Sequence, residues 1–515
     1  MSINLTVGYG SMLRIPASMV RSENVFKALA AQCVITNTRY ALAKHDGASE
    51  EELEKIPRSI KMWYHDDEYM YVPRHVNLEP LAPNYFIREI DFWRRVREQA
   101  SPILTNIQLR DAVQEEAYTY LMKPGDKCIS LACGRGKTVI ALKVACDRGF
   151  RKILIIVPTT DLAQQWIEDG ILGFTDSGRE TPFIPGMKRE DIGMIGGGKR
   201  KIGKRFTLGI INTLALGKDL DRLRDEFDLV IFDEVHRYGT EKFHLAASRF
   251  NAERHALSAT LSRADRMDVL FKMHVGETVY TNLEQDLMSK VLVVSTPYGM
   301  DHKGQDFPQV RDTIPGRGFL STMLLRDIGR TDLIADMLVA AYETNRNMLI
   351  LTNRKQFILE LQRLLLAKGI PGADIGLIYS AKGITKADKA KAKLRRLVIA
   401  IDSMVKEGFD RKDKDLWGDF DTIFMTIPLY GENTFNQVRG RIERSFSGKW
   451  APIVIVFADS HTLIRTQVLK LREIANKNNM TVEFMDDPDK DFRYYLTLQT
   501  RAEVCLQHAH SQTVD

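Results

Sequence analysis

The sequence is poor in cysteine and has no long apolar run. Its five cysteines, Cys33, Cys128, Cys133, Cys146 and Cys505, show neither a CxxC pair nor a Cys/His pair with metal-ligand spacing. This pattern favours reduced thiols in a cytosolic protein over a disulfide framework. No stretch of about 18 apolar residues occurs, so we expect no membrane span. The opening MSINLTVGYG lacks the basic and apolar regions of a signal peptide, and we expect a cytoplasmic protein.

An excess of one charge is also lacking. The chain of 515 residues has 73 lysines and arginines against 67 acidic residues, a net charge of +6. Such a balance permits nucleic-acid binding but does not require it. The hydrophobic fraction of 44% and the charged fraction of 27% are ordinary for a globular protein. The length favours about three domains.

Short apolar runs rich in β-branched residues alternate with amphipathic stretches along most of the chain. The first series reads KCISLA, KILIIVP, FTLGIINT, LVIFDE and HALSAT. After a less regular region near 280–320, the second reads NMLILTN, IGLIYS, RLVIAID, TIFMTIP and PIVIVFAD. Alternation of buried strands with helices is typical of parallel α/β sheets. We predict two α/β domains, over 105–280 and 320–475, and a C-terminal extension over 476–515.

The first hundred residues have a different pattern. VFKALAAQC is helix-like, and IKMWYHDDEYMYVPRHV alternates aromatic and polar residues around a turn, as a hairpin does. We therefore predict a small α+β domain over 1–100. Its aromatic residues could stack on bases, but in a small β-domain such residues more often form the core, which we favour for Trp63, Tyr64, Tyr69 and Tyr71.

Residues 131–142, LACGRGKTVIAL, have the pattern of a phosphate-binding loop between a strand and a helix. Gly134 and Gly136 let the backbone approach phosphates, Lys137 supplies a cation, and Thr138 supplies a hydroxyl for Mg²⁺. The dipole of the following helix favours anions. One departure is Leu131, which stands where the general pattern has glycine.

A second motif, LVIFDEVHRYG, places two acidic residues, Asp233 and Glu234, at a strand end. An acid there can hold Mg²⁺ through water, and its neighbour can orient an attacking water. An acidic strand cap is the alternative, but the phosphate-binding loop upstream on the same sheet argues against it. The spacing of His236 behind this pair indicates a sensor between the nucleotide and the next strand.

These segments, in this order, resemble superfamily 2 helicases of the DEAH/DEVH type over about residues 105–460. The resemblance is to phage branch-migration helicases, DNA-repair helicases and restriction-enzyme motor subunits. IQLRDAVQEEAYTYL resembles the segment that reads adenine, and LACGRGKT resembles motif I. DEVH resembles motif II, and LSATLSRAD resembles motif III. The resemblance implies nucleotide contacts from the first two segments, including Arg110, Gln114 and Arg135. It also implies coupling between ATP and strand through Ser258 and Thr260, followed by Arg263 and Asp265 as in the repair helicases.

Other segments resemble the family's nucleic-acid contacts. VPTTDLAQQW resembles motif Ia, with Pro158 and Thr159, and Thr213 stands at a position that faces the strand. The basic run GGGKRKIGKR, with Lys199 and Arg200, falls where the family contacts phosphates, although a solvated basic loop is equally compatible.

The second domain carries segments that resemble motifs IV to VI. VIAIDSMVKEGFD has Gly408 and Asp410 at motif V positions, and QVRGRIER has Gln437, Arg441 and Arg444 at motif VI positions. An arginine supplied by a second domain can stabilise charge on the transferring phosphoryl group when the cleft closes.

The resemblance implies an ATP- and Mg²⁺-dependent DNA helicase or translocase, acting as a monomer on forked or four-way DNA. It places the protein in phage-type replication, recombination or repair, with replication or recombination proteins as further partners. Residues 1–100 are then expected to contact duplex near the branch. Three alternatives stay open: an RNA helicase, the motor of a restriction system, and a nucleic-acid clamp without ATPase activity. The presence of Lys137, Asp233, Glu234, Arg441 and Arg444 argues against the clamp.

Overall fold

The computed structural model divides the chain into two compact units, Met1–Glu284 and Gln285–Asp515. It describes residues 3–20, 23–81, 85–90, 101–132, 134–173, 183–217, 221–238, 241–259, 268–277, 279–284, 287–381, 383–405, 419–428, 431–443, 449–486, 492–493 and 495–496. Several residues singled out above lie outside these ranges: Cys133, Thr260, Arg263, Asp265, Gly408, Asp410, Arg444 and Cys505. The other three cysteines are buried free thiols.

The N-terminal part of the first unit is an α+β domain, as expected. Its five-stranded sheet has the order β5-β6-β2-β1-β7. The strands are β1 (Ile3–Tyr9), β2 (Leu13–Pro16), β5 (Tyr64–His65), β6 (Tyr69–Val72) and β7 (Tyr85–Ile90). The antiparallel pair β5–β6 confirms the expected hairpin. Helices α1 (Glu23–Gln32), α2 (Thr38–His45) and α3 (Glu50–Glu54) complete the domain with the short pair β3 (Val34–Thr36) and β4 (Ser59–Lys61).

The expectation that all four aromatic residues of the hairpin form the core is wrong for the three tyrosines. Trp63 packs against the core of the domain, but Tyr64 is 50% exposed. Tyr69 and Tyr71 alternate with the buried Met70 and Val72, so they face away from the core. Tyr64 stacks on Tyr71 with ring centroids 4.4 Å apart. Successive side chains of a strand point to opposite faces, so burial of Met70 and Val72 directs the tyrosines away from the core. The aromatic composition alone does not show which face is buried.

The remainder of the first unit is a largely parallel eight-stranded sheet with the order β11-β10-β12-β9-β13-β14-β8-β15. Its strands are β8 (Lys127–Leu131), β9 (Ile153–Val157), β10 (Gly193–Gly196), β11 (Lys199–Lys201), β12 (Phe206–Ile210), β13 (Leu229–Asp233), β14 (Glu253–Ser258) and β15 (Val279–Asn282). Among the described strands of this sheet, only the pair β10–β11 is antiparallel. All five apolar runs of the first series form strands of this sheet. They are nearly continuously buried because helices cover both faces.

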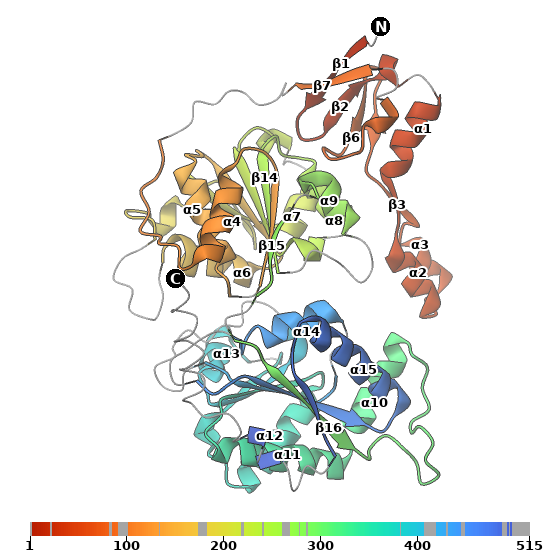
Figure 1. Ribbon diagram of the computed structural model, residues 1–515, viewed down its shortest axis with the longest axis vertical. Coiled ribbons are helices and arrows are strands. Elements are labelled where there is room, and N and C mark those ends of the chain that lie inside the picture. Colours follow the sequence, from red (N-terminus) through yellow and green to blue (C-terminus); the bar gives the residue numbers. More distant parts are fainter. Residues whose placement is uncertain are drawn as a thin grey trace. The chain divides into compact units, whose positions relative to one another are not determined.

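Two cores flank this sheet. One contains residues of α4 (Ala112–Met122), α5 (Lys137–Asp147) and α6 (Thr160–Gln165). The other contains residues of α7 (Ile211–Leu216), α8 (Glu241–Ala247) and α9 (Val269–Val275). Figure 1 shows the two groups of helices on opposite faces.

Buried charges join the N-terminal domain to this sheet within the first unit. Arg74 donates two hydrogen bonds of 3.1 Å to Asp126 and one of 2.9 Å to the carbonyl of Ala252. Arg254 donates to the carbonyl of Ser11 at 2.7 Å. Leu270 of α9 belongs to the core of the N-terminal domain. Removal of the N-terminal domain would therefore leave Asp126 buried without its arginine.

The second unit contains a seven-stranded parallel sheet with the order β18-β19-β17-β20-β21-β16-β22. The strands are β16 (Lys290–Thr296), β17 (Met348–Thr352), β18 (Ile375–Ile378), β19 (Leu397–Ile401), β20 (Thr422–Met425), β21 (Ile453–Asp459) and β22 (Val482–Met485). The five apolar runs of the second series are strands here. Strands β16 and β22 lie outside 320–475, so the sheet extends beyond the range in which we placed this domain.

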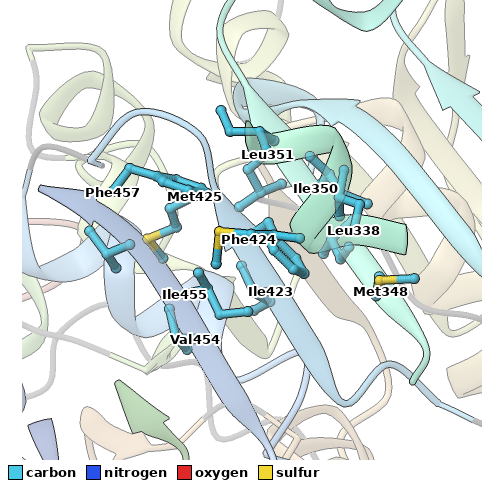
Figure 2. Packing of buried hydrophobic residues seen from close by; sticks show 14 of the residues in the cluster. Leu338, Met348, Ile350, Leu351, Ile423, Phe424, Met425, Val454, Ile455 and Phe457 are labelled. Atoms are coloured by element: carbon cyan, nitrogen blue, oxygen red, sulfur yellow. The ribbon is translucent and has the colours of Figure 1, made fainter. Parts of the chain in front are cut away.

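Helices surround the second sheet. They are α10 (Ile314–Leu324), α11 (Ile328–Glu343), α12 (Lys355–Ala367), α13 (Lys386–Lys393), α14 (Glu432–Arg439) and α15 (Thr462–Lys477). Figure 1 shows α11 and α12 on one side and α14 and α15 on the other. Figure 2 shows Ile423, Phe424 and Met425 of β20 packed between residues of β17 and β21. Across the part of the chain that the structure describes, no helix is long and apolar enough to cross a membrane.

Candidate nucleotide and nucleic-acid site

The phosphate-binding loop lies between β8 and α5, in the expected strand–loop–helix context. Gly134 has φ 83° and Gly136 has φ 78°, a left-handed conformation that favours glycine. A Cβ on Gly136 would lie 2.5 Å from the side-chain nitrogen of Gln114. The loop therefore requires glycine here for conformation and for space.

Gln114 supports this loop from α4. Its side-chain oxygen accepts a hydrogen bond from the backbone of Arg110 at 2.8 Å, and its side-chain nitrogen donates to the carbonyl of Arg135 at 3.1 Å. Arg110 forms an ion pair with Asp111 at 3.1 Å. The structure thus brings the segment that resembles the adenine-reading segment against the phosphate-binding loop. Asp111, which also accepts from Arg135 at 3.3 Å, was not singled out from the sequence.

Lys137 and Thr138 begin α5. The Lys137 ammonium donates to the carbonyls of Leu131 and Ala132 at 3.0 and 3.4 Å, so it points back into the loop. The N-terminus of an eleven-residue helix and a lysine meet at one point, as phosphate binding requires. The glycine loop, the Lys137 ammonium and the helix N-terminus are together suited to the phosphates of a nucleoside triphosphate.

Asp233 ends β13 and Glu234 follows it. Asp233 is 5% exposed and accepts a hydrogen bond of 2.7 Å from the indole nitrogen of Trp166. Burial, and next the negative charge of Glu234, raise the pKa of Asp233 to about 7, although Trp166 and Lys137 oppose the shift. A divalent cation would offset this cost of ionisation, so the carboxylate fits a Mg²⁺ position.

The sequence did not reveal Trp166 as part of this site. It lies in a π-helical turn, Trp166–Ile171, after α6. A tryptophan in the segment that resembles motif Ia could have indicated this contact. A tryptophan there is expected to be buried, and a buried indole N–H needs a hydrogen-bond acceptor.

Glu234 has φ 53°, a strained value for a residue other than glycine. One of its carboxylate oxygens is buried and accepts no hydrogen bond within the described residues. That oxygen lies 3.3 Å from Nδ1 of His236, and the same Nδ1 lies 2.9 Å from the hydroxyl of Ser258 at the end of β14. The structure therefore connects three predicted residues through side-chain contacts: Glu234 lies next to His236, and His236 lies next to Ser258.

The predicted nucleic-acid residues gather at the ends of β9, β10 and β12. Pro158 and Thr159 follow β9, and Thr159 caps α6 by accepting from Leu162 at 3.3 Å. A Cβ on Gly196 would lie 3.4 Å from the hydroxyl of Thr213, so the glycine turn after β10 packs beside that residue.

The basic run follows this glycine turn. Lys199 and Arg200 lie exposed on β11, the edge strand that pairs with β10. A Cβ on Gly197 would lie 3.3 Å from Thr160, so the turn also touches the start of α6. No group of three or more His, Cys, Asp or Glu side chains arranged as a metal site occurs among the described residues.

In the second unit, Gln437 lies on α14 and Arg441 in the turn that follows. Arg439, which the sequence did not single out, forms an ion pair of 2.9 Å with Glu443. The roles of Gln437, Arg441 and the other predicted site residues stay predictions.

Comparison with known proteins relates this geometry to a family. Residues 106–263 match the family described as type III restriction enzyme, res subunit. A DNA 3'-5' translocase, XPB2 of Sulfurisphaera tokodaii, is 34% identical over 37% of this chain and 39% of its own length. A putative ATP-dependent RNA helicase of Acanthamoeba polyphaga mimivirus is 21% identical over 67% of this chain and 66% of its own. The chain thus matches less than two thirds of the length of either relative.

A solved structure shows the same fold. Dbp5 of S. cerevisiae, bound to RNA and ADP BeF3, matches 76% of this chain and 93% of its own with a TM-score of 0.51 at 14% identity. The two parallel-sheet domains are therefore tandem RecA-like domains. With these matches, the resemblance to superfamily 2 helicases seen in the sequence is confirmed.

Proposed function

We propose that the chain is an ATP-dependent motor that moves along DNA, and that its substrates are forked and four-way DNA in phage-type replication, recombination or repair. One observation carries the proposal. A phosphate-binding loop, an acidic pair and a basic hairpin lie on one sheet, and His236 connects the acidic pair to Ser258 at the end of the next strand.

The residues divide into three tasks in this proposal. Lys137 and the backbone at Gly134 and Gly136 hold phosphates, while Thr138 and Asp233 hold Mg²⁺. Glu234 orients water and accepts its proton, which its strained conformation and its buried oxygen 3.3 Å from Nδ1 of His236 support. Bound ATP would supply the bond whose hydrolysis releases free energy.

The remaining residues connect this chemistry to the strand. His236 and Ser258 would transmit the state of Glu234 to β14. Thr159, Thr213 and the exposed Lys199 and Arg200 would hold phosphates of the strand. Gln437, Arg441 and Arg444 would act on the nucleotide from the second domain, with Gly408 and Asp410 of motif V.

The test is ATP hydrolysis by the full chain with single-stranded DNA, forked DNA, a four-way junction and RNA as stimulators. We expect stimulation by DNA, and the highest turnover per bound ATP on branched substrates. Stimulation by RNA alone would establish the RNA helicase alternative, which the mimivirus relative's name brings into consideration. No hydrolysis with any of the four would refute a motor.

We further propose that the N-terminal domain contacts duplex near the branch. The outward-facing tyrosines support this, because Tyr64 is half exposed and Arg14 lies 4.6 Å from the ring of Tyr69. Deletion of the domain would disrupt the buried Arg74–Asp126 pair, so point variants are the better test.

Tyr64→Ala and Arg14→Ala should reduce the preference for branched over linear DNA and leave hydrolysis stimulated by single strands intact. Arg58→Ala is the control, since Arg58 also lies over a tyrosine ring of this domain, at 5.4 Å from Tyr40. Branch preference that survives in both test variants would remove this surface from the recognition of DNA.

A further inference from the structure

A pocket of about 560 Å³ lies within the second unit, where the end of α10, the start of α11 and one face of α12 meet. Three arginines, Arg326, Arg354 and Arg363, line it together with two acids, Asp332 and Glu360. Among the described residues that line it, none belongs to the proposed nucleotide and nucleic-acid site. A ligand bound there would contact residues to which the proposed motor gives no task.

Both acids of the pocket already have a cation beside them. The carboxylate of Glu360 accepts two hydrogen bonds from Arg363, at 2.7 and 3.2 Å. The carboxylate of Asp332 lies 2.8 Å from the ammonium of Lys368, which also pairs with Asp336 at 2.7 Å. Because these acids are engaged elsewhere, they do not compensate the charge of the other two arginines.

Those two arginines, Arg326 and Arg354, donate only to neutral oxygen atoms among the described residues. Arg354 is held against α10, because it donates to the hydroxyl of Thr322 at 2.8 Å and to the carbonyl of Gly318 at 2.5 Å. The guanidinium of Arg326 donates to the side-chain oxygen of Gln356 at 3.4 Å. A guanidinium has five N–H donors, and a carboxylate can accept two of them at once. Both arginines therefore retain donors for an anionic ligand.

Apolar side chains also line the pocket. Leu325 and Phe357 are buried, with exposures of 5% and 2%, whereas Ile328 is 86% exposed. Ile328 is the first residue of α11, so the helix fixes its backbone at the edge of the pocket. Burial of such an aliphatic side chain by a ligand is favourable. The pocket thus combines two cations that lack an acidic partner among the described residues with an exposed aliphatic contact.

We infer that this pocket binds an acidic peptide segment of a partner protein. Carboxylates of the segment accept hydrogen bonds from Arg326 and Arg354, and an apolar side chain of the segment covers Ile328. Charge complementarity carries the inference, together with the aliphatic contact. Single-stranded nucleic acid stacks its bases on exposed aromatic side chains, whereas the one aromatic residue among the described lining residues, Phe357, is buried. The inference does not depend on the proposed ATP and DNA contacts.

Fluorescence anisotropy of the full chain with a labelled peptide tests the ligand class. The probe is a short peptide of aspartate and glutamate with two leucines, and it should bind with an affinity that falls as the salt concentration rises. A peptide with amides in place of its carboxylates should bind at least about tenfold more weakly. A peptide with serines in place of its leucines should bind about three- to tenfold more weakly. No binding of the acidic peptide, or equal binding of all three, would refute the inference.

Variants of the chain test the location. Arg326→Glu should weaken binding of the acidic peptide at least about tenfold, and Ile328→Ser about three- to tenfold. The matched controls lie on α15, on the other side of the sheet (Figure 1). Arg465→Glu changes an arginine that also donates to a neutral oxygen at 3.4 Å, that of Ser460. Leu469→Ser changes an apolar side chain that is 56% exposed. Both controls should bind within about twofold of the wild type, and equal weakening in test and control variants would contradict the assignment to the pocket.

A single-stranded oligothymidylate separates a peptide site from a nucleic-acid contact. It should not displace the acidic peptide, and its own affinity should be the same in Arg326→Glu and in the wild type. Hydrolysis of ATP stimulated by single-stranded DNA should likewise stay within about twofold of the wild type in Arg326→Glu, because the pocket lies outside the proposed motor site. Displacement of the peptide by the oligothymidylate, or loss of stimulated hydrolysis in Arg326→Glu, would show that the pocket serves the nucleic acid and would overturn the inference.

Discussion

Asp233 in the first unit and Asp459 in the second occupy the same place in two sheets of the same kind. Each is the last residue of a central parallel strand, β13 or β21, and both are buried, with exposures of 5% and 0%. Asp459 accepts two hydrogen bonds from Arg330, at 2.7 and 2.9 Å, and one from Thr296. Asp233 has the neutral Trp166 indole in place of an arginine.

This difference is the one expected between a structural carboxylate and the catalytic carboxylate that we propose. A buried acid that is paired with a guanidinium is locked in one ionisation state and one geometry. A buried acid held by an indole is left with a raised pKa, about 7 for Asp233, caused by burial and by Glu234. Strongly shifted acids of this kind collect at functional sites. In the proposed function, the carboxyl edge of one sheet serves the nucleotide, while Asp459 at the same edge of the other pairs with Arg330 and stabilises the fold.

The largest effect should come from the acid beside Asp233. Glu234→Gln should retain ATP binding but lower turnover by about a hundredfold or more, because the amide cannot accept a proton. Lys137→Ala should abolish turnover. Asp374→Asn is the control: Asp374 lies in the second unit and accepts a hydrogen bond of 2.6 Å from Tyr342. Turnover at the wild-type rate in Glu234→Gln would refute the assignment of motif II.

The next largest effect should be on stability. Arg330→Leu leaves Asp459 buried without its cation and should lower the free energy of unfolding by about 3–5 kcal/mol. Arg363→Ala, which breaks an exposed pair with Glu360, should cost less than about 1 kcal/mol. Chemical denaturation of both variants checks this. A loss below about 1 kcal/mol for Arg330→Leu would mean that Asp459 does not need its partner.

A paired acid in the first unit should show the opposite pH dependence to Asp233. Glu253 forms an ion pair with Arg148 and lies 3.1 Å from His255. Burial opposes its ionisation, but the bonds from His255 and Arg148 outweigh burial and lower its pKa from 4.5 to about 2.

The sign of the pH dependence follows from that shift. Because the unfolded state binds the proton more readily, stability from Glu253 is complete above pH of about 4.5 and is lost as the pH falls toward 2. The shift corresponds to at most about 3 kcal/mol. Glu253→Gln should flatten the loss of stability between pH 5 and 3, measured by denaturation. An unchanged slope would show that the pair does not contribute.

The sequence predicted the strands that carry chemistry because they are short, apolar and buried on both faces. It missed β16, although its residues VLVVST have the same composition, because we treated 280–320 as irregular. Strand β16 pairs with β21, more than 150 residues later in the chain. Such long-range pairing is set by the tertiary fold, and the local pattern does not show which sheet a run joins.

The site was predictable only where residues form local motifs. The loop around Gly136, the pair Asp233–Glu234 and the position of Ser258 followed from spacing and resemblance. Trp166 and Asp111 did not, because each contacts a partner distant in sequence, Asp233 or Arg135. Nothing in a carboxylate's local sequence distinguishes Asp233 from Asp459; the partner that the fold brings to it does.

The smallest effect is the most direct test of the comparison. Asp233→Asn removes a charge that burial disfavours and keeps an oxygen that can accept from Trp166, so in Mg²⁺-free buffer at pH 8 it should raise the free energy of unfolding by about 1–2 kcal/mol. Asp459→Asn should lower it, because Arg330 would lose its counter-ion.

The pH dependence supplies the sign check for Asp233. A carboxyl whose pKa is raised from 3.8 to about 7 holds its proton in the folded state where the unfolded state has lost it. Stability therefore falls as the pH rises from about 4 to about 7 and does not recover above that range. Asp233→Asn should remove this part of the decline, while Asp459→Asn should not. If both asparagine variants were destabilised equally at pH 8, the two carboxylates would be structural alike, and the raised pKa of Asp233 would no longer mark the nucleotide site.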